Sequence, residues 1–166
     1  PLPRNCGHDD DVNGAIAAYK RAIALDPTSA DLVASLARLY METDHDEEAV
    51  ATAEQALKIE PDSREAHRIL GTMYASRAMS AGGSARPSSA VERESLGKAI
   101  EHLEVAVNRS PRDADVQDRA TLAELYVTAG SYDKAIPLLS ELVKQEPQWQ
   151  DGATLLAEAY SAAGRS

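Results

Sequence analysis

Residues 27–61 read PTSADLVASLARLYMETDHDEEAVATAEQALKIEP, and this stretch decides the fold. Its first half carries the pattern Leu36-Ala37-x-x-Tyr40, whose members lie on one face of an α-helix. Its second half carries Ala49-Ala53-Ala56-Pro61, in which small Ala49 lets paired helices approach to about 8–10 Å. A proline inside a helix removes a backbone hydrogen bond and clashes with the preceding turn, so Pro61 is expected to end the second helix and start a turn. The stretch therefore predicts two paired helices.

Both patterns recur along the chain in a constant register. Further copies of the first are Leu70-Gly71-x-x-Tyr74, Leu122-Ala123-x-x-Tyr126 and Leu156-Ala157-x-x-Tyr160. Further copies of the second are Ala15-Tyr19-Ala22-Pro27, Ala99-Leu103-Ala106-Pro111 and Ala135-Leu139-Leu142-Pro147. Leu36 lies nine positions after Pro27, and Ala49 lies nine positions after Tyr40. The basic period is therefore about 34 residues.

This period and these patterns resemble the tetratricopeptide repeat family, whose unit is two antiparallel helices. The resemblance covers residues 9 to about 164. It implies an all-α fold, an α-solenoid in which helix hairpins stack into a right-handed superhelix with the first helices on its concave side. For function it implies protein interaction.

The repeats predict one array over residues 1–166. A half unit with only its second helix (9–29) precedes units at 30–63, 64–115 and 116–149, and a half unit with only its first helix (150–166) follows. First helices are expected at 29–43, 63–79, 115–129 and 149–163, and second helices at 10–25, 46–59, 89–109 and 133–145. The two half units predict a fragment of a longer array and end-to-end self-association through its exposed ends.

The unit at 64–115 carries a sixteen-residue insertion around 78–95. Its middle, residues 80–89, is rich in Gly, Ser and Pro, which predicts a loop. Ser89-x-x-Glu92 has the spacing of a capping box, so the next helix is expected to start near 89 and to run about two turns longer than usual. Two interpretations stay open: a protruding loop that contacts a partner, and a tolerated insertion at a hairpin tip.

Charge and composition exclude several classes of function. The net charge is −10 with a pI near 4.8, which disfavours nucleic acid and acidic membrane surfaces. No apolar run approaches the roughly 20 residues that span a bilayer, so membrane insertion is not expected. Cys6 is the single cysteine and cannot form an internal disulfide, which favours the cytoplasm and is also compatible with the periplasm.

No catalytic or cofactor-binding motif is present, and the chain is predicted not to be an enzyme and to need no cofactor. Two acidic segments have ligand types that a divalent cation accepts: His8-Asp9-Asp10-Asp11 and Asp44-His45-Asp46-Glu47-Glu48. Each precedes a predicted helix, where carboxylates compensate the helix dipole. We favour that explanation and predict no metal site.

The resemblance implies a peptide groove on the first helices, and the predicted groove residues are Arg38, Met41, Arg68, Ile69, Thr72, Glu124 and Leu155. Arg38 and Arg68 could jointly hold a carboxylate of an extended peptide. Alternatively, each pairs with a nearby acid such as Glu42 or Glu65.

We predict a non-catalytic scaffold that binds a protein or peptide of unknown identity. The alternative is a regulatory or targeting segment of a larger enzyme or assembly whose catalytic part lies outside this chain.

Overall fold

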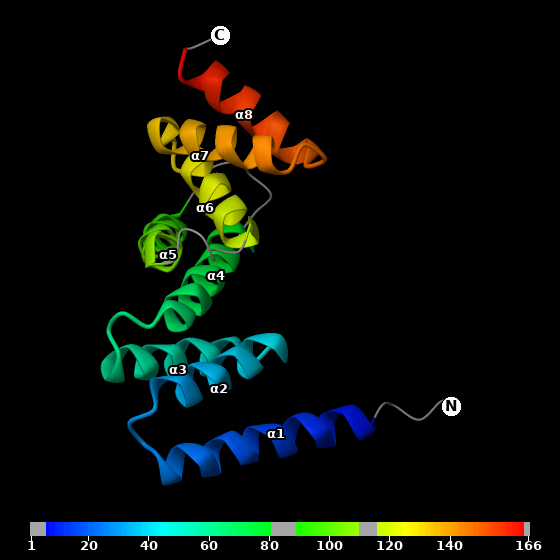
Figure 1. Ribbon diagram of the computed structural model, residues 1–166, viewed down its shortest axis with the longest axis vertical. Coiled ribbons are helices and arrows are strands. Elements are labelled where there is room, and N and C mark those ends of the chain that lie inside the picture. The colour runs from blue at the N-terminus through cyan, green and yellow to red at the C-terminus, as the bar shows by residue number, and fades with distance from the viewer. Residues whose placement is uncertain (1–5, 81–88, 110–115, 165–166) are drawn as a thin grey trace. The chain divides into compact units, whose positions relative to one another are not determined.

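The computed structural model describes residues 6–80, 89–109 and 116–164, and within these ranges it contains eight α-helices and no strand (Figure 1). They are α1 (Cys6–Leu25), α2 (Ala30–Glu42), α3 (Asp46–Ile59), α4 (Arg64–Ser80), α5 (Ala90–Arg109), α6 (Val116–Thr128), α7 (Tyr132–Gln145) and α8 (Gln150–Ala162). The all-α prediction is confirmed. Seven helices begin and end within one residue of their predicted bounds, and α1 begins four residues earlier.

The helices form two compact units, residues 1–73 and 74–166, and the boundary falls inside α4. In the first unit, α2 packs against both α1 and α3. In the second unit, α5, α6 and α7 each pack against the next helix, and α6 also touches α8 (Figure 1). Because α6 and α8 are both first helices, the first helices of successive repeats lie side by side in this unit.

Buried alanines form the contacts between helices. Ala49, Ala53 and Ala56 of α3 are fully buried. Ala99 and Ala106 of α5 and Ala135 of α7 are fully buried as well. A methyl group leaves room for a neighbouring backbone, which allows helices to approach closely.

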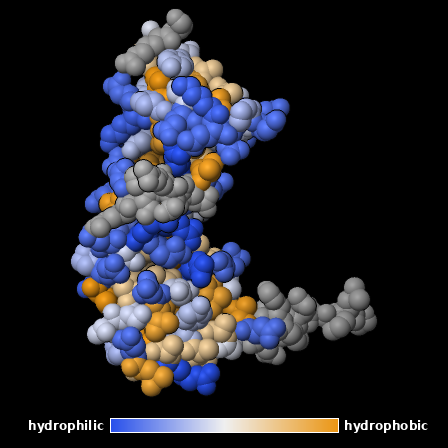
Figure 2. Space-filling model, viewed as in Figure 1, coloured by the Kyte–Doolittle hydropathy of each residue, from blue (hydrophilic) through white to orange (hydrophobic). Residues whose placement is uncertain are grey.

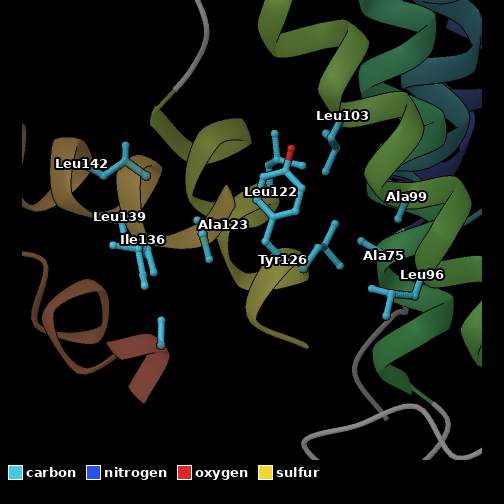
Figure 3. Packing of buried hydrophobic residues seen from close by; sticks show 13 residues of the cluster. Ala75, Leu96, Ala99, Leu103, Leu122, Ala123, Tyr126, Ile136, Leu139 and Leu142 are labelled. Carbon is cyan, nitrogen blue, oxygen red and sulfur yellow. The ribbon is translucent and has the colours of Figure 1, made fainter. Parts of the chain in front are cut away.

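The core of the second unit gathers around α6 (Figure 3). Leu122 and Tyr126 point from α6 toward α5, where Leu103 lies. On the other side of α6, the α7 residues that complete the same cluster are Ile136, Leu139 and Leu142. On the face shown in Figure 2, hydrophilic residues cover most of this unit, and hydrophobic residues show only in small separate patches.

Two helix-ending turns share one hydrogen-bond pattern. The backbone N–H of Ser131 donates to the carbonyl of Tyr126 at 2.8 Å, and that of His45 donates to the carbonyl of Tyr40 at 2.9 Å. Gly130 has a φ of 73°, as its position in a turn predicts. Asp44 takes the equivalent position with a φ of 58°, a conformation that Asp tolerates better than most residues.

Side-chain caps set the start of two helices. The N–H of Leu32 donates to Ser29 Oγ at 3.4 Å at the start of α2. At the start of α5, the N–H of Glu92 donates to Ser89 Oγ at 3.1 Å, and the N–H of Ser89 donates to Glu92 Oε2 at 3.2 Å. The predicted capping box is therefore confirmed. Helix α5 has 20 residues against 14 in α3, which confirms the predicted extra length. The predicted loop at 80–89 lies almost wholly outside the described residues.

Glu104 joins three helices of the second unit. It lies on α5 and accepts hydrogen bonds from Tyr126 Oη of α6 and Lys134 Nζ of α7, both at 2.6 Å. Burial alone would raise the pKa of Glu104, but the hydrogen bonds from Lys134 and Tyr126 outweigh it and lower the pKa. Burial and the bond to Glu104 raise the pKa of Tyr126. The network therefore holds a carboxylate and a neutral phenol.

We expect Tyr126→Phe to lower the free energy of unfolding by about 1–2 kcal/mol, because it removes one hydrogen bond to a charged group while keeping the ring. Urea unfolding at pH 7 measures this change. Tyr160→Phe is the control, because Tyr160 on α8 is 37% exposed and should change stability by less than about 0.5 kcal/mol. Equal effects of the two substitutions would contradict the role of the Glu104 network.

Candidate binding surface

First helices of the second unit border a cleft of about 460 Å³. Its apolar walls come from Met79 at the end of α4, Val127 of α6 and Leu155 of α8. Its carboxylates are Glu124 of α6 and Asp151 and Glu158 of α8. The remaining lining residues are Thr128, Tyr132 and Thr154. The cleft thus combines apolar and acidic groups.

Helix periodicity places these side chains on the cleft. On α6, the buried stripe contains Leu122 and Tyr126, which leaves Glu124 and Val127 between the buried positions and only partly covered. On α8, the cleft residues recur at 151, 154, 155 and 158, which is the spacing of one helical face. The surface therefore follows from how α6 and α8 pack against α7.

The electrostatics of the cleft centre on Glu124. Its side chain is half-buried, and burial raises its pKa; the neighbouring carboxylate of Asp151 raises that pKa further. In the part of the chain that the structure describes, Glu124, Asp151 and Glu158 form no ion pair, and no lining residue is basic. The cleft therefore holds negative charge that the described residues around it do not neutralise.

In the first unit, the predicted arginines converge on one carboxylate. Arg68 Nε donates to Glu65 Oε2 at 3.0 Å and its Nη2 donates to Oε1 at 2.7 Å, while Arg38 Nε lies 3.8 Å from the same Oε1. The hydrogen bond from Arg68 lowers the pKa of Glu65, against the effect of burial. The sequence left two alternatives for Arg38 and Arg68: joint binding of a peptide carboxylate, or pairing with a nearby acid. The second describes this arrangement, because both guanidinium groups face Glu65.

The other predicted groove residues differ in accessibility. Met41 is half-buried and packs against the core cluster of Leu36, Tyr40 and Ala49. Thr72 is half-buried, and its hydroxyl donates to the carbonyl of Arg68 at 2.9 Å. Ile69 is fully buried, which corrects its placement in the groove.

The error at Ile69 has a structural reason. The residues of α4 that are buried include Ala66, Ile69, Leu70 and Met73. This buried stripe is wider than the Leu70-Gly71-x-x-Tyr74 pattern alone indicates, so Ile69 belongs to the covered side of the helix.

Sequence reasoning placed Glu124 and Leu155 on the groove, and the structure brings them together in one cleft. It missed Asp151, Met79 and Tyr132. Asp151 lies one helical turn before Leu155, a spacing that could have indicated it. Met79 and Tyr132 reach the cleft from helix ends next to connections, where the repeat pattern carries no signal.

A second cleft of about 400 Å³ lies between α5 and the turn that joins α6 to α7. Leu96, Gly97 and Ile100 line it on α5, and Gly130 lines it on the turn. Its only charged lining residue among those described is Arg93, which already interacts elsewhere in the chain. It offers fewer polar groups to orient a partner than the first cleft does.

The acidic segments have different outcomes. Asp46, Glu47 and Glu48 form the first turn of α3, where their carboxylates face the positive end of the helix dipole. The side chains of His8, Asp9 and Asp10 lie outside the described residues. Over residues 6–80, 89–109 and 116–164, no group of three His, Cys, Asp or Glu side chains is arranged to hold a metal ion. None of the helices in these ranges is long and apolar enough to span a membrane.

Comparison with known proteins identifies the repeat. The family model described as "Tetratricopeptide repeat" matches residues 8–72 and 90–159. No curated protein sequence matches the chain. The fold is similar to that of several solved structures, and at their levels of sequence identity the likeness concerns the fold alone.

Three of these structures illustrate the range. The crystal structure of MamA protein is 22% identical with a TM-score of 0.69, and the match covers 95% of this chain and 76% of that one. YrrB, described as a TPR protein with an unusual peptide-binding site, is 20% identical with a TM-score of 0.71, over 95% and 72% of the two chains. In the structure of Naa15/Naa10 bound to HypK-THB, one chain is 22% identical with a TM-score of 0.67. The match covers 95% of this chain and 21% of that one.

We expect Glu124→Gln to raise the free energy of unfolding at pH 7 by up to about 1 kcal/mol, allowing for solvent screening at a half-exposed site. The folded-state pKa of Glu124 is raised, so the folded state binds more protons than the unfolded state just above pH 4.5, and stability falls as the pH rises through that window. The gain from Gln should therefore shrink as the pH falls toward 4.

Urea unfolding at several pH values measures this effect. Among the described residues that line the cleft with Glu124, the titratable groups are Asp151 and Glu158 of α8 and Tyr132 of α7. Glu101→Gln, at an exposed position of α5, is the control and should show no such gain at pH 7. A gain for Glu124→Gln that is the same at pH 4 and pH 7 would show that charge is not its cause.

Proposed function

We propose that this chain, which belongs to the tetratricopeptide repeat family, is a non-catalytic scaffold that binds a segment of a partner protein over its first helices. Membership of the family supports a role in protein–protein interaction. The observation that carries the finer proposal is the cleft of the second unit, where α4, α6 and α8 present apolar and acidic side chains together.

The size of the cleft favours a segment of chain with several anchoring side chains. A volume of about 460 Å³ lies within the usual range for ligand sites. Burying one large apolar side chain contributes only about 1.5–3 kcal/mol. A micromolar affinity needs about 8 kcal/mol, so more than one anchor is required. Met79 is 49% exposed at the cleft, and its flexible thioether adapts to different apolar partners.

In the first unit, the proposed contact residues are Arg38, Met41, Arg68 and Thr72. Arg38 Nε lies 3.8 Å from Glu65 Oε1, an oxygen that already accepts a hydrogen bond from Arg68 Nη2 at 2.7 Å. Arg38 is the more accessible of the two arginines, with 46% of its side chain exposed. The exposed guanidinium of Arg38 supports a contact with a partner carboxylate in that unit.

The alternative proposal is a regulatory or targeting segment within a larger enzyme or assembly. The similarity to a chain of the Naa15/Naa10 structure supports it, because the match covers only 21% of that chain and the structure contains several proteins. The peptide-binding site named for YrrB supports the first proposal instead.

We expect Thr154→Arg to weaken partner binding at the cleft. Thr154 is exposed on α8, so an arginine there fills the cleft and faces its carboxylates without entering the core. The tagged chain is used to capture proteins from a native lysate, and quantitative mass spectrometry measures recovery. Recovery of specific partners should fall at least about tenfold, which corresponds to about 1.4 kcal/mol.

The matched control is Gln55→Arg, which makes the same change of charge at an exposed position of α3. It should leave recovery unchanged. If both variants recover the same partners as the unaltered chain, binding does not use the cleft. Circular dichroism of each variant verifies that the helices are retained.

A second proposal is end-to-end self-association, and an uncovered tyrosine supports it. Tyr40 and Tyr126 are each 7% exposed, whereas Tyr160 at the equivalent position of α8 is 37% exposed. On α1, Leu25 is 89% exposed. Contact between these regions of two copies would bury both side chains.

We expect light scattering at rising protein concentration to give a mass above the monomer value of 17.8 kDa. Tyr160→Glu should return the mass to the monomer value, because it places a charge on the contact surface. Thr154→Glu adds the same charge to the cleft and should leave association unchanged. A strict monomer at every concentration would exclude self-association.

A further inference from the structure

We infer that the cleft of the second unit selects a basic partner segment, in which a lysine or arginine lies next to an apolar residue. This inference rests on the proposed function and adds the chemistry of the partner. It stands on three observations made on the described residues: apolar walls, three carboxylates without an ion pair, and no basic residue among those that line the cleft.

The charge of the cleft differs from that of other partly covered acids in this chain. Glu65 is paired with Arg68, and Glu104 is paired with Lys134. Glu124 is also half-buried, yet in the described residues its charged neighbour is the carboxylate of Asp151. A partly desolvated carboxylate is costly to keep without a cation, so a cation supplied by the partner gains more here than at the open surface.

Other classes of partner fit the cleft less well. An acidic segment would add a carboxylate to three existing ones, and the whole chain, at a net charge of −10, would repel it. A purely apolar segment would remove more water from Glu124 without replacing its hydrogen bonds. A basic segment neutralises the cleft and is attracted to it at long range.

The walls of the cleft also suit a basic side chain. Lysine and arginine bury their methylene stems against apolar surface while the charged end reaches polar groups. Val127 and Leu155 offer that surface, with Glu124 on the same helix as Val127. Asp151 and Glu158 lie about two turns apart on α8, roughly 10 Å, so two basic residues can be held at once.

Selection from a random 12-residue peptide library displayed on phage tests the inference. The unaltered chain is the bait, and the variant Glu124→Gln/Asp151→Asn/Glu158→Gln is the comparison. We expect enriched peptides that contain lysine or arginine beside an apolar residue. Their synthetic copies, labelled with fluorescein, should bind the variant at least tenfold more weakly in fluorescence anisotropy and should lose affinity as salt is added.

The control variant is Glu47→Gln/Glu54→Gln/Glu101→Gln, which removes the same charge from exposed positions of α3 and α5. It should keep the affinity of the unaltered chain within about twofold. Equal losses in both variants would show that only net charge matters and would overturn the inference.

Two further outcomes separate this inference from the proposed function. If the enriched peptides lack basic residues and do not bind the Thr154→Arg variant, the inference of a basic partner is overturned, and the proposal of binding at the cleft stands. Absence of enrichment, or peptides that bind Thr154→Arg as well as the unaltered chain, would overturn both.

Discussion

Helices in this protein meet over alanines that have no exposed surface, among them Ala49, Ala53, Ala99 and Ala135. The chain contains no phenylalanine, and at these alanine positions contact depends on close approach of the helix backbones. A larger side chain at these positions would push the helices apart. The position of the cleft follows from the same constraint, because α6 and α8 lie together through their common packing on α7.

Helix bounds could be predicted closely because local signals mark both ends. Prolines end the second helices, and the Ser89–Glu92 pair starts α5. Which face of each helix is buried was harder to predict. Ile69 is an example, because its burial depends on all the elements that pack on α4. Of the cleft, Glu124 and Leu155 were predictable from spacing within one helix. Met79 was not, because it reaches the cleft from the end of α4, next to the insertion.

Acidic residues on the first helices have different charged neighbours in the two units. In the first unit, Glu65 is surrounded by Arg38 and Arg68, and its carboxylate is held in the charged form. In the second, Glu124 and Asp151 lie together, and the pKa of Glu124 moves in the opposite direction. The first helices therefore hold a carboxylate paired with arginines in the first unit and neighbouring carboxylates that form no ion pair among the described residues in the second.

The capping box fixes where α5 begins, so the register of the α5 side chains does not depend on how many residues precede Ser89. Reciprocal bonds between Ser89 and Glu92 define the first turn locally, and Leu96 and Ala99 then reach the core at set distances from that start. Residues added or removed upstream of Ser89 leave this count unchanged. The frame of α5 is thus set by residues 89–92 and not by the number of residues before them.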